Sequence, residues 1–332
     1  MSSGTFTITP RGPFSLAEAA AFGFGQRDAQ GRDGCMRLAF CLDGYQAHVG
    51  VEVRQAPPGD TGAAEVHGMF RGPVDVDPDA VRRQVARVLS LDHDGAEFLR
   101  VGERDPVIGR LQAAAPGLRP PLFYSPYEAA AWSVLSARRP ARQMAQVRDR
   151  LSEAHGAVFD LDGVRLAAFP APGQLLEIES FPGVPDEKLR RLHGVAHAAL
   201  EGRLDVGHLM KQGPEVAMAE LQSIKGIGPF YSALIVIRGT GFTDVLPVGE
   251  PKALALAARL YQLAGPPSEA EFRELAEVWR PFRSWAVVLI RAAAGRILDD
   301  ERLSGGGEVP IDEVVAEFAG RVDPAEQGAE VG

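Results

Sequence analysis

The sequence predicts an α+β protein, with a small N-terminal domain built on an antiparallel sheet and a helical bundle after it. Residues 1 to about 88 contain short runs in which apolar and polar residues alternate, as they do in half-buried strands. From about residue 89 onward this alternation nearly disappears and helical periodicity replaces it. Strands that come first and helices that follow are typical of the α+β class.

The N-terminal domain, residues 1–88, is predicted to combine strands with two helices. We expect strands at TFTITP, CMRLAFCLD, AHVGVEVRQ and AEVHGMFRG, and helices at SLAEAAAFGF and DPDAVRRQVARVLSL. An acid and a proline begin the second helix. Cys35 and Cys41 are the only cysteines, and their spacing fits neither a zinc site nor a redox pair, which favours buried free thiols.

The second region, residues 89–298, is predicted to be helical apart from one short hairpin at 157–169. Apolar residues there recur at helical spacing rather than alternating. The expected helices are 126–138, 140–154, 186–201, 214–222, 229–239, 251–263, 268–278 and 282–296.

Residues 299–332 are predicted to form an acidic, mobile tail with at most one helix, at 310–320. The tail carries −8 of the total net charge of −9, so residues 1–298 are close to neutral. Within those residues, cations gather locally at Arg138, Arg139, Arg142, Arg148 and Arg150, at Lys188, Arg190 and Arg191, and at Arg280, Arg283 and Arg291. Such clusters can form one phosphate-binding face or can be solvated helix faces.

The composition and the lengths of the apolar runs argue against a membrane protein. The apolar content of 45% and the charged content of 24% are ordinary for a globular chain. No apolar run approaches the length of a transmembrane helix, and MSSGTFTITPRG lacks a signal pattern. We therefore expect a cytoplasmic protein with no membrane contact.

The segment 221–239, LQSIKGIGPFYSALIVIRG, places a Gly-Ile-Gly turn between two apolar helical segments. Gly226 and Gly228 can adopt conformations that other residues disfavour and allow another backbone to come close. Pro229 suits the first turn of the next helix, whose free amides favour an anion. The turn therefore predicts a backbone grip on a nucleic-acid phosphate, although many helical hairpins turn on glycine without any ligand.

Glu250 stands directly before Pro251, where another helix is expected to begin. Its carboxylate would project from a helix end into the space left by the preceding loop. Glutamate is not among the preferred capping residues, which favours a role other than capping, but a simple capping acid is the alternative.

These segments together resemble the helix-hairpin-helix DNA glycosylases, on the 3-methyladenine DNA glycosylase II (AlkA-like) branch. The specific parts are IKGIGPFYSALIVIRGTGFTDVLPVGE and WRPFRSWAVVLIRAAAGR. FTITPRGPFSLAEAAAF, LSLDHDGAEFLRVGERDPVIGRL and PLFYSPYEAAAWSVLSARR extend the resemblance over about residues 5–297. It implies two helical subdomains with a cleft between them, and base excision repair of double-stranded DNA by hydrolysis of the N-glycosidic bond of an alkylated purine.

The resemblance also implies where the damaged base is held. A base must leave the duplex before its sugar bond can be attacked, and aromatic rings stack on it. Phe230 stands where the family has a pocket tryptophan, and Trp285 lies in a segment that supplies another aromatic residue. The other pocket candidates are Trp132, Tyr124, Tyr127 and Trp279, and each of the six can equally be a core residue. The DNA-binding candidates are Lys225, Gly226, Ile227, Gly228, Arg138 and Arg139.

The chain departs from the family pattern at two places, and a third position separates it from strand-nicking relatives. Glu250 replaces the usual catalytic aspartate, and its extra methylene moves the carboxylate by about 1 Å, a change that can cost about 100-fold in rate. Ala137, Arg138 and Arg139 replace the usual glutamine and apolar wedge. Phe230 occupies the position at which strand-nicking relatives carry a lysine nucleophile, which predicts a monofunctional enzyme.

The departure at Glu250 leaves two alternatives open: a damage-binding protein that does not cut, and a helical protein-interaction domain that keeps only the fold. The sequence predicts no required metal or cofactor. The resemblance adds a possible monovalent cation among the carbonyls of 224–229. Nothing in the sequence indicates an obligatory protein partner.

Overall fold

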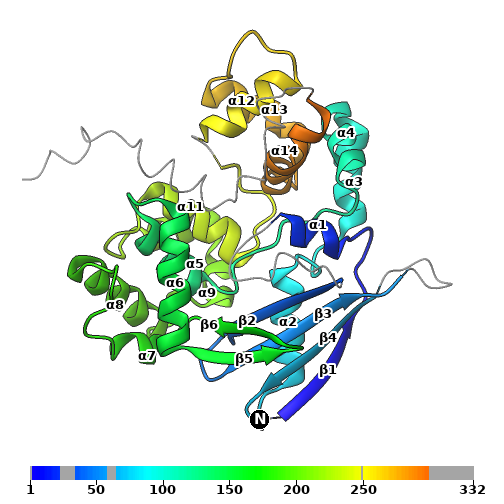
Figure 1. Ribbon diagram of the computed structural model, residues 1–332. Coiled ribbons are helices and arrows are strands. Elements are labelled where there is room, and N and C mark those ends of the chain that lie inside the picture. Colours follow the sequence, from blue (N-terminus) through cyan, green and yellow to red (C-terminus); the bar gives the residue numbers. More distant parts are fainter. Residues whose placement is uncertain (1, 23–33, 58–64, 248–249, 299–332) are drawn as a thin grey trace, which may run out of the picture.

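The structure is a computed structural model that describes residues 2–22, 34–57, 65–247 and 250–298 (Figure 1). Its N-terminal part is a four-stranded antiparallel sheet with the strand order β1-β4-β3-β2. The elements of this part are β1 (Ser2–Ile8), α1 (Leu16–Ala21), β2 (Cys35–Cys41), β3 (His48–Gln55), β4 (Val66–Gly72) and α2 (Pro78–Val88).

Both faces of the sheet are covered at β2 and β3, which explains why all seven residues of β2 are buried, whereas β4 alternates buried and more exposed residues. The helix α2 lies along one face, and the hairpin of β5 (Ala157–Leu161) and β6 (Val164–Ala168) lies on the other (Figure 1). The hairpin approaches so closely that a Cβ on Gly50 would lie 2.6 Å from the Phe159 ring. Cys35 and Cys41 are buried free thiols, as the sequence predicts.

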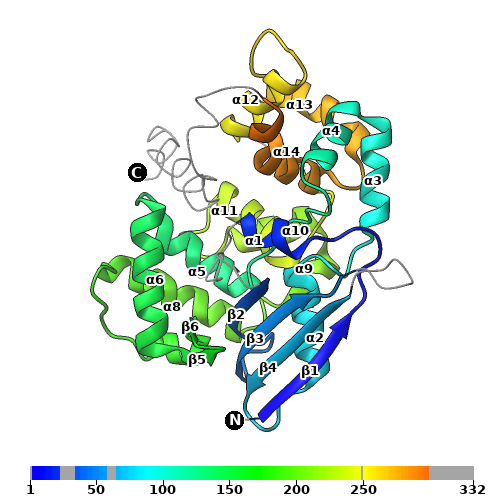
Figure 2. The same ribbon diagram turned by 45° about the vertical axis from the view of Figure 1, so that its right-hand side comes forward.

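The helices form two groups with separate cores, visible in both ribbon views (Figures 1 and 2). The middle group begins after residue 125 and contains the glycine turn. Its helices are α5 (Pro126–Ser136), α6 (Ala141–His155), α7 (Pro172–Leu176), α8 (Asp186–Leu200), α9 (Val206–Gln212), α10 (Pro214–Leu221), α11 (Pro229–Ile235) and the π-helical η1 (Val236–Thr240).

The other helical group joins two separate stretches of the chain around Trp279 and Trp285. It combines an early pair of helices with the last helices of the described chain, because α14 packs along α4. Its elements are α3 (Gly95–Arg104), α4 (Pro106–Ala114), α12 (Pro251–Leu260), α13 (Glu269–Ala276), the short 3-10 helix η2 (Glu277–Trp279) and α14 (Arg283–Ile297).

The predicted fold class is confirmed, and the differences are local. The strands and the hairpin lie where alternation predicts them. The expected helix 229–239 is instead α11 followed by the π-helical turn η1. Four short helices were not predicted individually. They are α3, α4, α7 and α9, which have ten, nine, five and seven residues.

The N-terminal core also includes side chains from beyond residue 88. Leu89, Leu91 and Tyr124 also belong to it. None of the helices in the described part of the chain has the length and apolarity that a bilayer crossing requires. The acidic tail and its predicted helix at 310–320 lie outside the described residues.

Candidate functional site

The glycine turn connects α10 to α11 and keeps its outer side open. Gly226 has φ +102°, a conformation that favours glycine, and Gly228 is the N-cap of α11 with an extended backbone. Ile227 is buried and its amide donates to Ile224 O at 3.0 Å, so this residue anchors the turn to the core. A Cβ added to Gly228 would meet nothing within 4 Å. The first amides of α11 thus start beside open space, where an anion can approach.

The predicted wedge segment lies at the end of α5. Arg138 has φ +56°, and Arg138 and Arg139 are both exposed. The Lys188 ammonium of α8 donates to the carbonyls of Leu135 and Ala137, the latter at 2.8 Å. Burial, followed by the nearby charges of Arg139 and Arg191, lowers the pKa of Lys188 to about 8. Lys188 thereby caps the C-terminal end of α5, where a cation is favourable, and fixes the segment that carries the two arginines.

Glu250 is the N-cap residue of α12, but its side chain makes no capping hydrogen bond. Its Oε1 lies 3.2 Å from Arg291 Nε of α14, and the two side chains are 16% and 8% exposed. Burial raises the pKa of the Glu250 carboxyl, while the charges of Arg291, Lys252 and Arg238 act against that rise. The carboxylate is therefore largely buried against the Arg291 guanidinium and is not directed to bulk solvent.

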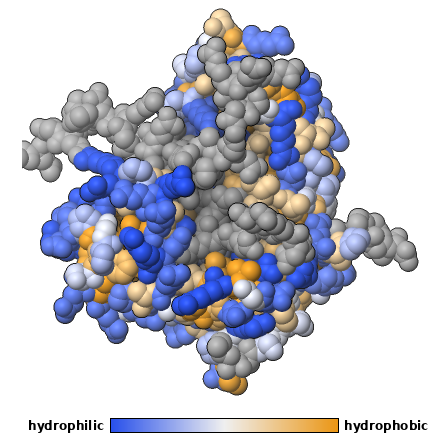
Figure 3. Space-filling model, in the orientation of Figure 1, coloured by the Kyte–Doolittle hydropathy of each residue, from blue (hydrophilic) through white to orange (hydrophobic). Residues whose placement is uncertain are grey.

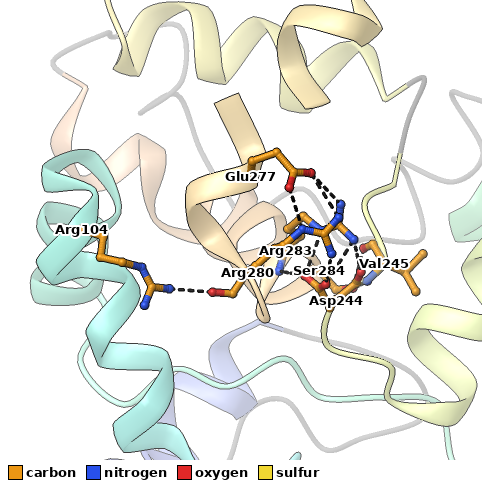
Figure 4. Close-up of polar contacts among 7 residues, drawn as sticks. All are labelled: Arg104, Asp244, Val245, Glu277, Arg280, Arg283 and Ser284. Atoms are coloured by element: carbon orange, nitrogen blue, oxygen red, sulfur yellow. Dashed lines mark hydrogen bonds and ion pairs between the residues drawn. The ribbon is translucent and has the colours of Figure 1, made fainter. Parts of the chain in front are cut away.

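The loop that leads to Glu250 is fixed to the start of α14 (Figure 4). The Asp244 carboxylate accepts from Arg283 Nε at 2.8 Å and from Arg280 Nη1 at 2.7 Å. The Ser284 hydroxyl donates to Val245 O at 2.6 Å and accepts from Val245 N at 3.1 Å. Because Arg291 lies two helical turns beyond Arg283, α14 holds both ends of the loop between Asp244 and Glu250.

The six aromatic pocket candidates lie in three different cores. Phe230, Trp132 and Tyr127 belong to the middle helical group, Trp279 and Trp285 to the other group, and Tyr124 to the N-terminal core. Of the six, only Phe230 is partly exposed; it stands beside the glycine turn with its ring 5.3 Å from that of Tyr231.

Contacts within the cores explain several of these aromatic residues without any ligand. Tyr127 donates its hydroxyl to Pro170 O at 2.9 Å, and Trp279 Nε1 donates to Asp105 Oδ2 at 2.8 Å. Tyr124 stacks on Phe40 with a centroid distance of 5.0 Å. Trp285 packs edge-on against Phe98, and Trp132 lies under the guanidinium of Arg148, 5.1 Å from the ring centroid. The core interpretation that the sequence left open fits Tyr124, Tyr127 and Trp279 best.

Known proteins resemble this chain in sequence and in fold. The chain is 29% identical over 240 residues to DNA-3-methyladenine glycosylase 2 of Escherichia coli, covering 67% of this chain and 82% of that protein. The structure matches a 3-methyladenine DNA glycosylase from Archaeoglobus fulgidus with a TM-score of 0.67 at 20% identity, over 86% and 96% of the two chains. These matches in sequence and in fold support an AlkA-like member of the helix-hairpin-helix DNA glycosylase superfamily.

A second solved structure of the same fold, MBOgg1 with a low-affinity DNA ligand, has a TM-score of 0.68 at 14% identity. It covers 90% of this chain and 99% of that one. No protein-family model matches the sequence.

The third cationic cluster of this helix-hairpin-helix protein is used inside the chain. Arg280 and Arg283 pair with Asp244 and Glu277, and Arg291 pairs with Glu250. These three arginines therefore hold the loop before Glu250 and the Glu250 carboxylate itself, and the side chains of Arg283 and Arg291 are only 15% and 8% exposed.

Two residues important to the site were not given these roles from the sequence. Arg291 stands 41 positions after Glu250, and Lys188 stands about 50 positions after the helix end that it caps. Only the fold brings either pair together. No group of three or more His, Cys, Asp or Glu side chains is placed to hold a metal ion within residues 2–22, 34–57, 65–247 and 250–298.

Proposed function

We propose that this chain is a monofunctional DNA glycosylase that hydrolyses the N-glycosidic bond of alkylated purines, of the 3-methyladenine type, in double-stranded DNA. The observation that carries the proposal is the Glu250 carboxylate, which stands at the start of α12, downstream of the glycine hairpin, and is held there by Arg291 of α14. The names of the relatives support the reaction class and the substrate.

DNA binding is assigned to the hairpin. Amides at the start of α11 and the open side of Gly228 suit a backbone phosphate, and a grip of this kind reads no sequence. Lys225, which is 81% exposed, adds a cation next to the turn. Base pairing and stacking then have to be broken before the damaged nucleotide reaches the carboxylate.

Catalysis is assigned to the ionised form of Glu250. Cleavage of the bond between sugar and base leaves positive charge on the sugar, which a fixed carboxylate stabilises as the charge develops. A cationic alkylated purine is also a good leaving group and is attracted to an aromatic face such as that of Phe230. Arg291 holds the carboxylate in one position and favours its charged form.

Phe230 excludes one chemical route. With no amine at this position, a Schiff base with the sugar cannot form there. The product is therefore an intact strand with an abasic site, and borohydride should trap no covalent adduct on lesion DNA.

The carbonyl groups of residues 224–229 are proposed to hold a monovalent cation when DNA binds. Ile224 O and Gly228 O each already accept one amide, which leaves each oxygen a second lone pair. DNA affinity measured in potassium and in tetramethylammonium at equal ionic strength tests this assignment.

Incubation of the purified protein with methylated duplex DNA tests the proposed function. Chromatography of the supernatant should detect freed alkylated purines, with the DNA strands still intact. Salt-dependent DNA binding without any released base would instead favour the damage-binding alternative. If neither base release nor salt-dependent DNA binding is found, the fold would be the only property that the chain shares with the glycosylases.

A further inference from the structure

Helix α8 lies directly against the glycine turn, although about 35 residues separate them in sequence. A Cβ added to Gly226 would lie 3.0 Å from Arg191 Cδ of α8 and 3.6 Å from Val134 of α5. The absence of a side chain at Gly226 therefore leaves room for the Arg191 side chain of α8 directly beside the turn. As a result, the cations near the start of α8 lie beside the predicted phosphate site.

Two exposed cations and one half-buried cation surround one carboxylate at this place. Glu187 Oε2 lies 2.7 Å from Arg190 Nη2, and its Oε1 lies 3.0 Å from Arg191 Nε and 3.9 Å from Lys225 Nζ. The exposed fractions are 69% for Arg190, 37% for Arg191, 81% for Lys225 and 43% for Glu187. We call these four residues the α8 patch. Hydrophilic residues predominate on this side of the molecule, at the left of Figure 3.

The α8 patch is poorly explained as a stabilising feature of the fold. Exposed ion pairs contribute little to stability, because water and salt screen them and long side chains lose entropy. Hydrogen bonds from Arg190 and Arg191 lower the pKa of Glu187, so this carboxylate stays charged at neutral pH. Two guanidinium groups and one ammonium that converge on an anionic oxygen pair also have the donor arrangement that binds a phosphate.

We propose that Arg190, Arg191 and Lys225 bind a second DNA backbone phosphate beside the one at the glycine turn, and that Glu187 occupies these donors in the free protein. The inference rests on the proposed function, because it needs duplex DNA on the hairpin. On DNA, the phosphate competes with Glu187 for the same cations. Glu187 thus weakens binding to undamaged DNA, which a protein searching for rare lesions must be able to leave.

The decisive variant is Glu187→Gln, compared with Asp79→Asn as its control. Asp79 is the second residue of α2, as Glu187 is of α8, and it also pairs with an arginine three positions later, Arg82, at 3.0 Å. Both substitutions raise the net charge by one unit, but α2 belongs to the N-terminal sheet unit and not to the hairpin. Affinity for a short undamaged duplex is measured by fluorescence anisotropy over a range of KCl concentrations.

We expect Glu187→Gln to bind undamaged duplex about 3- to 10-fold more tightly than the wild type, and Asp79→Asn to bind like the wild type. Arg190→Ala and Lys225→Ala should each weaken binding and reduce the slope of log affinity against log salt by about one, whereas Arg82→Ala should not. Arg190→Ala added to Glu187→Gln should remove much of the gain.

Equal affinities of Glu187→Gln and Asp79→Asn would overturn the inference, as would an unchanged salt slope in both Arg190→Ala and Lys225→Ala. A wild-type protein that shows no salt-dependent DNA binding would instead overturn the proposed function itself. Base release from methylated DNA by the wild type is recorded on the same preparation, so the two failures can be told apart.

Discussion

The protonation state of one side chain, Glu250, controls the proposed chemistry. Burial raises the pKa of this carboxyl above its ordinary value of 4.5, and the charge of Arg291 is the largest influence in the opposite direction. Only the ionised carboxylate can stabilise a positively charged sugar. The base-release rate should therefore fall as the pH decreases through this raised pKa, at a higher pH than an exposed glutamate would give.

Arg291→Met tests this dependence on charge. Loss of the cation beside Oε1 removes the main force that lowers the pKa of Glu250, so its pKa rises further. We expect the acidic limb of the single-turnover pH profile to move upward by about one pH unit or more. Arg273→Met, which removes an exposed arginine of α13 paired with Glu269, serves as the control. An acidic limb that stays in place in Arg291→Met would show that Arg291 does not set the ionisation of Glu250.

The two glycines of the turn have different roles: Gly228 leaves space for a phosphate, and Gly226 permits the backbone conformation of the turn. Substitution of each glycine separates these roles. Gly228→Ala should change the free energy of unfolding by no more than about 1 kcal/mol, since the new Cβ meets open space. The same Cβ obstructs an approaching phosphate, so DNA affinity should fall about tenfold. Gly226→Ala should instead destabilise the fold by about 1–2 kcal/mol, because φ is +102° there. Thermal unfolding and anisotropy on both variants check this contrast; undiminished DNA affinity in Gly228→Ala would remove the turn as a phosphate site.

The loop between Asp244 and Glu250 is the second element that can be tested. Asp244→Asn removes the carboxylate that Arg280 and Arg283 hold, which frees one end of the loop. A displacement of Glu250 by about 1 Å should lower the single-turnover rate by about 10- to 100-fold and leave DNA affinity unchanged. Glu277→Gln is the matched control, because Glu277 pairs with the same two arginines but with no residue of the loop. Equal rates in the two variants would contradict the positioning role.

Elements with clear local signals were predictable from the sequence, and elements defined by packing were not. Alternation identified β2 and β3, and Pro251 marked the start of α12. The helices α3 and α4 were not recognised individually, although Asp94 and Asp105 cap them. The π-helical turn after α11 leaves no clear periodic signal, since the apolar run continues through it.

The candidate site was predictable in part. The turn and Glu250 each have a local signature in the sequence, a pair of glycines and an acid before a proline. Their partners have none, because Arg291 and the α8 patch reach them only through tertiary packing. Most of the aromatic candidates could not be separated from core residues by type alone, since stacking on a base and packing in a core use the same side chains.

In the whole molecule, Arg119 joins the N-terminal sheet unit to the helices. It is 1% exposed and donates to the carbonyls of Pro13, Ser90, His93, Arg11 and Gly12. Burial lowers the pKa of Arg119 to about 10, so it remains charged at neutral pH. The segment after β1 and the segment before α3 are thereby held together.

Arg119→Met should lower the free energy of unfolding by about 3–5 kcal/mol, because buried carbonyls lose their donor. Urea denaturation measures the change, and Arg100→Met, at an exposed position of α3, is expected to be near neutral. Equal stability of the two variants would mean that the two units are held together without Arg119.

Single-turnover release of alkylated purine by Glu250→Gln tests the proposed role of Glu250 most directly. The variant keeps nearly the same shape and loses the charge, so we expect a rate about 100-fold or more below that of the wild type, with similar affinity for methylated duplex on the same samples. Base release at the wild-type rate by a well-folded Glu250→Gln protein would contradict the assignment of this carboxylate as the catalytic group.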